Sequence, residues 1–246
     1  SSEINYEYIE FKKIFFSDKC ISLENNNGEL NLLQSGGRII SLDKDNILFS
    51  TGDYRKRSLA QNNNSINGKL IKININNLDY EIVSKGHRNP QGLYHDKLKN
   101  IVLETEHGPA GGDEINLIYL NSKTELNYGW PISSYGGHYG GGAKVKKLKK
   151  KYPLHKSHKD YGFIEPLYYF TPSIGISEIV KIENGLYVIS SLKTKSIYFF
   201  ELNSKNNLIK IDEINLGERI RDLNYKNNKL YFYFEDTASL GIIKLN

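Results

Sequence analysis

Residues 178–202, EIVKIENGLYVISSLKTKSIYFFEL, show the folding pattern of this chain most plainly. β-Branched and aromatic residues form three short runs, and turns rich in Asn, Gly, Lys and Thr separate the runs. Residues 219–246, RIRDLNYKNNKLYFYFEDTASLGIIKLN, repeat the scheme of strand, turn, strand, turn and strand. These two units predict antiparallel meanders, and such a meander is how one blade of a β-propeller looks in sequence.

Similar strand-like runs occur along the rest of the chain. Together with those above they lie at Arg38–Leu42, Ile47–Thr51, Lys69–Ile75, Ile101–Thr105, Ile115–Leu120, Ile179–Ile182, Leu186–Ser190, Ser196–Glu201, Leu208–Ile214, Lys229–Phe234 and Gly241–Leu245. No long stretch has the periodicity of an amphipathic helix. Many short strands at fairly even spacing predict an all-β fold, either a sandwich, a barrel or a propeller, and we expect a single domain over residues 1–246.

Composition excludes several classes of protein. The 246 residues are 39% hydrophobic and 25% charged, unlike a disordered or collagen-like chain, and no apolar run is long enough to span a membrane. The single cysteine, Cys20, excludes an intrachain disulfide and a multi-cysteine zinc site. Because methionine is absent, Ser1 is not a native translation start, and we expect a processed or trimmed N-terminus.

Residues 132–172 interrupt the strand pattern, and we expect them to form a long Lys-rich loop. Eight lysines lie between Gly141 and Phe163, against one acid, Asp160. A solvated basic loop is the favoured interpretation, and a patch for polyanions or a membrane surface over Lys144–Lys159 is the alternative. Nucleic acid is not expected as a partner, because nucleic-acid sites usually interleave Arg or aromatic residues with the lysines.

The motif GHRNPQGL, residues 86–93, contains groups suited to ligand binding. The guanidinium of Arg88 matches a carboxylate or a polarised carbonyl, and Asn89 is held extended by Pro90. A structural turn capped by Arg88 explains the motif equally well.

The motif TEHGPAGGDEINL, residues 105–117, combines flexible glycines with acidic residues. Backbone carbonyls together with the carboxylates of Glu106, Asp113 and Glu114 suit Ca²⁺ better than Zn²⁺ or copper. An acidic glycine turn is the simpler alternative. The motif NYGWP, residues 127–131, follows and places two aromatic residues on a turn.

These three motifs, in this order, resemble the soluble PQQ-dependent aldose sugar dehydrogenases, the glucose/sorbosone dehydrogenase family (PQQ is pyrroloquinoline quinone). SGGRI (35–39) and STGDY (50–54) upstream, and SSLKTKSIYFFEL (190–202) and GERIRDL (217–223) downstream, fit the same family. The resemblance implies a six-bladed β-propeller. Family members carry further blades ahead of the matching segment, so we expect a trimmed chain or a relative with fewer blades.

The resemblance assigns cofactor-binding roles to five residues. Arg88 and Asn89 would contact the oxygens of PQQ, while Lys193, Arg219 and Arg221 would neutralise its carboxylates and the reduced quinone.

The metal ligands implied by the resemblance form two sites. The carbonyls of Gly108 and Pro109 would hold the Ca²⁺ that binds the cofactor. Glu114 and Tyr128 match residues of a second, structural Ca²⁺ site.

The catalytic residues implied by the resemblance are Gln34, Asp53 and Arg88. The family's general base is a His four residues before the Arg of G-G-R, and counting back from Arg38 gives Gln34. An amide is a poor proton acceptor, whereas a general base contributes about 10²–10⁴-fold to the rate. Asp53 matches an aspartate near that base and is itself a conceivable base.

The resemblance implies a PQQ- and Ca²⁺-dependent dehydrogenase that oxidises an aldose sugar at C1 to a lactone, impaired by the loss of the His. Family members also imply a periplasmic or secreted location. The first alternative is a non-catalytic propeller that binds sugar, calcium or a protein partner. The second is a polyanion-binding scaffold acting through Lys144–Lys159. The electron acceptor and the oligomeric state are not indicated.

Overall fold

The structure is a computed structural model that describes residues 11–17 and 33–245. Cys20 lies outside these residues. Within them, no helix has both the length and the apolar character that crossing a membrane requires.

The described residues build four sheets, each consisting mainly of antiparallel neighbours. The first sheet contains β1 (Gly36–Ser41), β2 (Asn46–Thr51), β3 (Lys69–Asn74), β4 (Tyr80–Lys85) and a short parallel strand, β8 (Leu126–Asn127). The second contains β5 (Pro90–Asp96), β6 (Ile101–Glu106), β7 (Asp113–Tyr119) and β9 (Tyr168–Phe170). The third contains β10 (Ile176–Lys181), β11 (Tyr187–Ser191), β12 (Ser196–Leu202) and β13 (Leu208–Asn215). The fourth contains β14 (Ile220–Lys226), β15 (Lys229–Phe234) and β16 (Ser239–Lys244).

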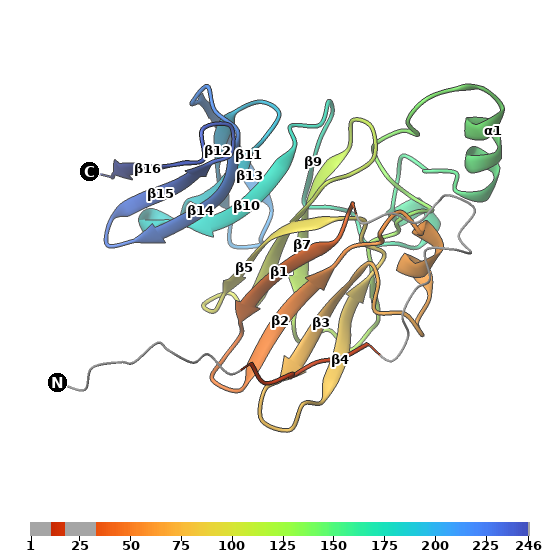
Figure 1. Ribbon diagram of the computed structural model, residues 1–246, viewed down its shortest axis with the longest axis horizontal. Coiled ribbons are helices and arrows are strands. Elements are labelled where there is room, and N and C mark those ends of the chain that lie inside the picture. The colour runs from red at the N-terminus through yellow and green to blue at the C-terminus, as the bar shows by residue number, and fades with distance from the viewer. Residues whose placement is uncertain (1–10, 18–32, 246) are drawn as a thin grey trace.

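The first strands of successive sheets lie next to one another. β1 contacts β5, β5 contacts β10, and β10 contacts β14, so the four sheets follow one another in chain order (Figure 1). This is how successive blades are arranged in a β-propeller. The prediction of an all-β fold of the propeller type is confirmed, and no sheet of the described residues closes on itself.

The hydrophobic core lies in the layers between neighbouring sheets. Alternate residues of one strand point to opposite faces, so a strand buried on both sides supplies two layers. In β6, Val102 packs with the first sheet and Leu103 with the third. In β11, Val188 packs with the fourth sheet and Ile189 with the second. Each buried Val, Leu or Ile side chain contributes about 1.5–3 kcal/mol, so these layers hold the sheets together.

The expected strands are all present, with ends that differ by a few residues. β4, β8 and β9 were not anticipated as strands, and neither was β5. It begins at Pro90 and contains Gly92, and both residue types are uncommon in strands. Gly92 is required because a Cβ there would lie 2.7 Å from the Ser177 carbonyl oxygen of β10. The close packing of two sheets therefore outweighs the low β propensity of Pro90 and Gly92.

The segment expected as a Lys-rich loop contains a helix, α1 (Gly142–Lys151), a 3-10 turn (Lys159–Tyr161) and strand β9. Lys and Leu are good helix formers, and Pro153 follows the end of α1. The helix has no buried residue, which explains why its sequence carries no apolar face long enough to predict it. Two further 3-10 turns lie at Arg57–Gln61 and Glu183–Gly185.

Candidate functional site

A cavity of about 740 Å³ lies where the first strands of the four sheets begin. Gln34 precedes β1, Asn89 precedes β5, Gly175 precedes β10, and Arg221 lies near the start of β14. The side chains and loops that line the cavity come from all of these segments: Leu33, Gln34, Ser35, Arg88, Asn89, Gln91, His107, Gly108, Ala110, Gly111, Asp113, Tyr139, Ser173, Gly175, Lys193 and Arg221. Its volume falls within the range of small-molecule sites.

Gln34 links the cavity wall to a buried carboxylate. With its amide nitrogen facing Asp53, Gln34 donates to Asp53 Oδ1 over 2.8 Å and accepts from Arg88 Nη2 over 2.7 Å. Gln34 has a φ of 66°, a left-handed conformation that is uncommon for residues other than glycine. The fold thus holds the predicted catalytic residues Gln34, Asp53 and Arg88 in direct contact.

Asp53 lies behind Gln34 and does not line the cavity. Its Oδ1 also accepts from the Arg55 N–H (2.7 Å), and its Oδ2 accepts from Trp130 Nε1 (2.8 Å). Burial raises the pKa of Asp53, and the nearby Arg88 guanidinium opposes that rise. The Trp of the NYGWP motif therefore anchors the carboxylate beneath the cavity, a role for which the sequence offered no signal beyond the motif itself.

Arg88 is buried and oriented from several sides. Its Nη1 donates to the His107 carbonyl over 2.6 Å, its backbone N–H donates to Glu106 Oε2 over 2.7 Å, and its guanidinium lies 5.5 Å from the Trp130 ring centroid. Burial lowers the pKa of Arg88, and Asp53 is the main opposing charge. Asn89, also at the cavity, accepts from the Gly36 N–H over 3.3 Å.

Lys193 and Arg221 reach the cavity, whereas Arg219 is not among its lining residues. Lys193 is placed by a turn in which its N–H donates to the Ile174 carbonyl over 2.9 Å. Arg221 pairs with Glu235 over 2.8 Å. Arg219 also approaches Glu235, over 3.5 Å.

The glycine loop after β6 forms another wall. Gly108 lines the cavity, but Pro109 does not, and the Pro109 carbonyl accepts from the Gly112 N–H over 3.1 Å. The Asp113 carboxylate accepts from the backbone N–H groups of Gly108 (3.2 Å) and Gly175 (2.7 Å). Asp113, which had been considered only as an oxygen ligand, therefore ties two walls of the cavity together.

The other predicted metal ligands, Glu114 and Tyr128, lie away from this cavity and meet at His158. His158 Nδ1 lies 2.8 Å from the Tyr128 carbonyl oxygen, and His158 Nε2 lies 3.5 Å from Glu114 Oε1. Burial disfavours the charged imidazole, but Glu114 outweighs burial and raises the pKa of His158. The two predicted ligands are therefore neighbours, and their metal-binding role stays a prediction.

The donor set of the cavity fits an anionic ligand. Arg88, Lys193 and Arg221 bring three cationic groups to its wall, and the Asp113 carboxylate is occupied by backbone N–H donors. His107 also lines the cavity, and its Nε2 has no hydrogen-bond partner among the described residues. PQQ is a tricarboxylate of suitable size, so these residues fit it. Gly108 also lines the cavity, and a backbone carbonyl is a ligand type that an oxygen-binding cation such as Ca²⁺ accepts.

The family model for Glucose / Sorbosone dehydrogenase matches residues 16–244. The aldose sugar dehydrogenase YliI of Escherichia coli is 27% identical over 235 residues, which cover 86% of this chain and 59% of that protein. An uncharacterized protein of Synechocystis sp. is 29% identical over 218 residues, which cover 76% and 50% of the two chains. The chain thus spans between half and three fifths of these relatives.

Solved structures agree with the sequence comparison. A crystal structure of a glucose dehydrogenase is 26% identical, with a TM-score of 0.71 over 86% of this chain and 64% of that one. The PQQ-bound form of an aldose sugar dehydrogenase from Streptomyces coelicolor is 23% identical and shares the fold, with a TM-score of 0.63 over 83% of this chain and 57% of that one.

Proposed function

Because the chain belongs to the glucose/sorbosone dehydrogenase family, we propose that it binds PQQ and Ca²⁺ in the 740 Å³ cavity and oxidises an aldose sugar there. One observation supports this most: Arg88, Lys193 and Arg221 reach a single cavity from three different parts of the fold. Arg88 is buried, Arg221 is half-buried and Lys193 is exposed. Like charges that face one space repel one another, and a bound anion relieves that repulsion. A planar tricarboxylate supplies that charge.

Different residues would contact different parts of such a cofactor. Lys193 and Arg221 would pair with its carboxylates, while Arg88 and Asn89 would donate to its quinone oxygens. The carbonyls of Gly108, which lines the cavity, and of Pro109, which adjoins Gly108 in the chain, would bind Ca²⁺. When bound, the quinone supplies the hydride acceptor, and the metal makes it more electrophilic.

The proton of the sugar hydroxyl needs an acceptor at the cavity. In the contacts described above, the Gln34 amide donates to Asp53 and accepts from Arg88, so it orients groups but takes no proton. Asp53 has a raised pKa but is screened from the cavity by Gln34. We therefore propose slow oxidation of the sugar to its lactone, below the rate that a general base would allow by about 10²–10⁴-fold.

Cofactor binding and turnover test the proposal separately. The melting temperature of the protein should rise when PQQ and CaCl₂ are added together, because a ligand that binds only the folded state stabilises it. Dye-coupled oxidation of glucose and other aldoses then measures turnover. Unchanged melting at saturating PQQ would remove the proposal.

A non-catalytic binding protein is the second candidate. The engagement of the Gln34 amide with Asp53 and Arg88 favours it, since this leaves the wall without the family's proton acceptor. A melting shift with PQQ and Ca²⁺ but no dye reduction with any aldose would select this candidate. An extracytoplasmic location belongs to the proposal in either form.

A further inference from the structure

Strands β6 and β7 place a row of polar side chains inside the protein. Glu104 and Glu106 are two residues apart on β6 and therefore point to the same face. Across the ladder they pair with Asn116 and Glu114 of β7. All four residues are nearly or fully buried, with at most 3% of their surface exposed. Such a row is costly unless cations or hydrogen bonds compensate its charge.

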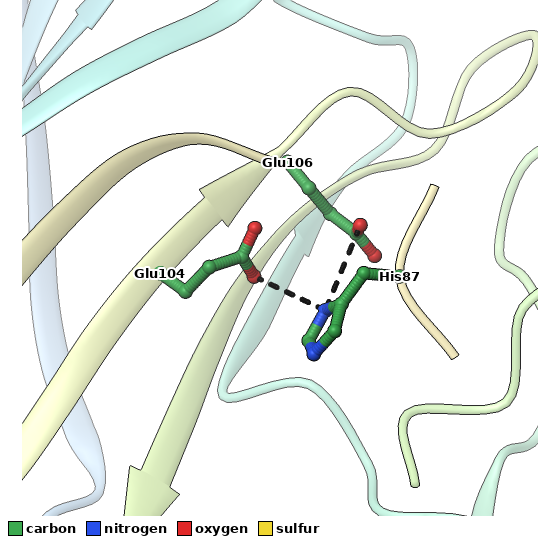
Figure 2. A group of neighbouring side chains, drawn as sticks. All are labelled: His87, Glu104 and Glu106. Atoms are coloured by element: carbon green, nitrogen blue, oxygen red, sulfur yellow. Dashed lines mark ion pairs between the residues drawn. The ribbon is translucent and has the colours of Figure 1, made fainter. Parts of the chain in front are cut away.

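His87 points into this row from the connection between β4 and β5 (Figure 2). Its Nδ1 lies 3.8 Å from Glu104 Oε2 and 3.8 Å from Glu106 Oε2, and the three donor atoms all lie within 4.8 Å of one another. The ring is held by Ser84 Oγ, 2.8 Å from Nε2, and by stacking on Tyr128. The orientation of Nδ1 toward the two carboxylates is therefore built into the fold.

Two polar atoms of this cluster lack partners. Among the described residues, His87 Nδ1 and Glu104 Oε1 are buried without a hydrogen bond. The nearby Lys69 ammonium donates to three backbone carbonyls, those of Leu59, Ala60 and Asn67. The two glutamates thus share this buried space with an unpartnered imidazole nitrogen, and no Lys or Arg side chain of the described residues belongs to the cluster.

We propose that His87 Nδ1, Glu104 and Glu106 bind a divalent first-row transition metal ion, with Zn²⁺ or Mn²⁺ as the best candidates. One imidazole nitrogen with carboxylate oxygens suits these ions, whereas Ca²⁺ prefers oxygen ligands alone. The two carboxylates balance the charge of the ion. Metal–ligand bonds of about 2.0–2.2 Å bring ligand atoms to roughly 3.4 Å from one another, so the cluster would contract from 3.8 Å at the two His87–glutamate distances and from at most 4.8 Å elsewhere.

Hydrogen bonds behind the ligands support the assignment. Asn116 Nδ2 donates to Glu104 Oε2 over 2.9 Å, and the Arg88 N–H donates to Glu106 Oε2 over 2.7 Å. Such outer donors fix metal-binding carboxylates in place. Since Glu106 also holds the backbone of Arg88, the ion would brace the floor beneath the cavity. The three ligands of this ion are different residues from Gly108, Pro109, Glu114 and Tyr128, the Ca²⁺ ligands implied by the family resemblance. Binding of this ion does not depend on PQQ.

The test uses the full chain without PQQ or sugar. The protein is unfolded in guanidinium with EDTA, desalted, and refolded with ZnCl₂, MnCl₂, CaCl₂ or no metal, because a closed site fills as the chain folds. Metal content is then measured after gel filtration. We expect one equivalent of Zn²⁺ or Mn²⁺ per chain, and a higher melting temperature than that of the metal-free sample. The wild-type chain is also refolded with Co²⁺. Visible absorption typical of a Co²⁺ ion bound by nitrogen and oxygen would show that the ion occupies such a site.

Variants locate the ion. Glu104→Gln and Glu106→Gln should lose the bound metal, whereas Glu178→Gln, which alters a buried glutamate paired with Arg38, should retain it. Absence of Zn²⁺, Mn²⁺ and Co²⁺ from the refolded wild-type protein would overturn the proposal. So would full metal content in the Glu104→Gln and Glu106→Gln variants, or retention of Ca²⁺ alone. PQQ binding measured on the same samples reports on the proposed function independently.

Discussion

The side chains of Gln34 and Asp53 are hydrogen-bonded over 2.8 Å at the wall of the cavity. Two interlocked turns create this pair: the Tyr54 N–H donates to the Gln34 carbonyl over 3.1 Å, and the Gly52 N–H donates to the Ser35 carbonyl over 2.8 Å. Residue 52 must be glycine, because a Cβ there would lie 1.9 Å from the Gln34 carbonyl oxygen. The side chain at position 34 is therefore presented to the cavity with a carboxylate directly behind it.

Gln34→His should increase the rate of aldose oxidation. An imidazole at this place can donate to Asp53 through one nitrogen and accept a proton at the cavity through the other. We expect kcat in the dye-coupled assay to rise by about 10²-fold, the lower end of what a general base contributes. Gln34→Asn, which keeps an amide, is the control and should show no rise. Equal rates for the His variant and the wild-type protein would mean that position 34 is not where the proton is taken.

Lys193→Ala should weaken PQQ binding. The change removes one charge-assisted contact, which corresponds to about 1.5–3 kcal/mol or roughly 10–100-fold in Kd. Titration of PQQ in the presence of Ca²⁺, followed by calorimetry, measures the effect. Lys195→Ala is the matched control, because Lys195 pairs with Asp236 and does not line the cavity. Equal losses in both variants would indicate only a general effect of net charge.

Trp130→Phe should destabilise the fold beneath the cavity. It leaves Asp53 Oδ2 without the indole donor while keeping an aromatic ring in place. A buried acceptor that loses its partner costs about 1–3 kcal/mol in the free energy of unfolding. Urea denaturation followed by circular dichroism measures this, with Tyr80→Phe, at an exposed ring, as the control. A change below about 0.5 kcal/mol, typical of surface substitutions, would contradict the anchoring role of Trp130.

Asp96→Asn should destabilise the protein at neutral pH and much less in acid. Asp96 Oδ2 accepts from Lys181 Nζ (2.7 Å) and Tyr187 Oη (2.5 Å), which joins β5 to the third sheet. Burial alone would raise the pKa of Asp96, but these hydrogen bonds outweigh it and the pKa is lowered. Stability from this carboxylate is then present above its unfolded pKa of about 3.9 and is lost as the pH falls through the lower folded value.

Urea unfolding of the wild-type protein and Asp96→Asn between pH 7 and pH 2.5 measures this difference. We expect about 1–3 kcal/mol at pH 7, shrinking toward the acid end. A difference that grows in acid would refute the assignment of a charged Asp96.

Local sequence patterns predicted most of the strands but not all of them. Alternation and turn residues marked the third sheet, from Ile179 to Ile214, nearly residue by residue. β5 was missed because Pro90 and Gly92 oppose a strand locally, and contact with the next sheet decides the matter. Helix α1 was missed because a helix without buried residues leaves no apolar period to detect.

The candidate site was predicted in part. Gln34, Arg88, Asn89, Gly108, Lys193 and Arg221 line the cavity, with Asp53 directly behind. Arg219 and Pro109 do not line it: Pro109 adjoins Gly108, which does, and Arg219 is two residues from Arg221, which does. Spacing along a strand or turn says which residues are near in the chain, whereas the side that each one faces depends on how the sheets pack.

The amino-acid sequence by itself determined the strands, the turns and the family motifs, since these depend on residues a few positions apart. Only the tertiary structure decided that Asp113 ties two cavity walls together, that Trp130 anchors Asp53, and that His87 faces Glu104 and Glu106. Those contacts join segments from different sheets, and no local rule specifies them. They form because the packing of the four sheets brings the ends of distant strands into one place.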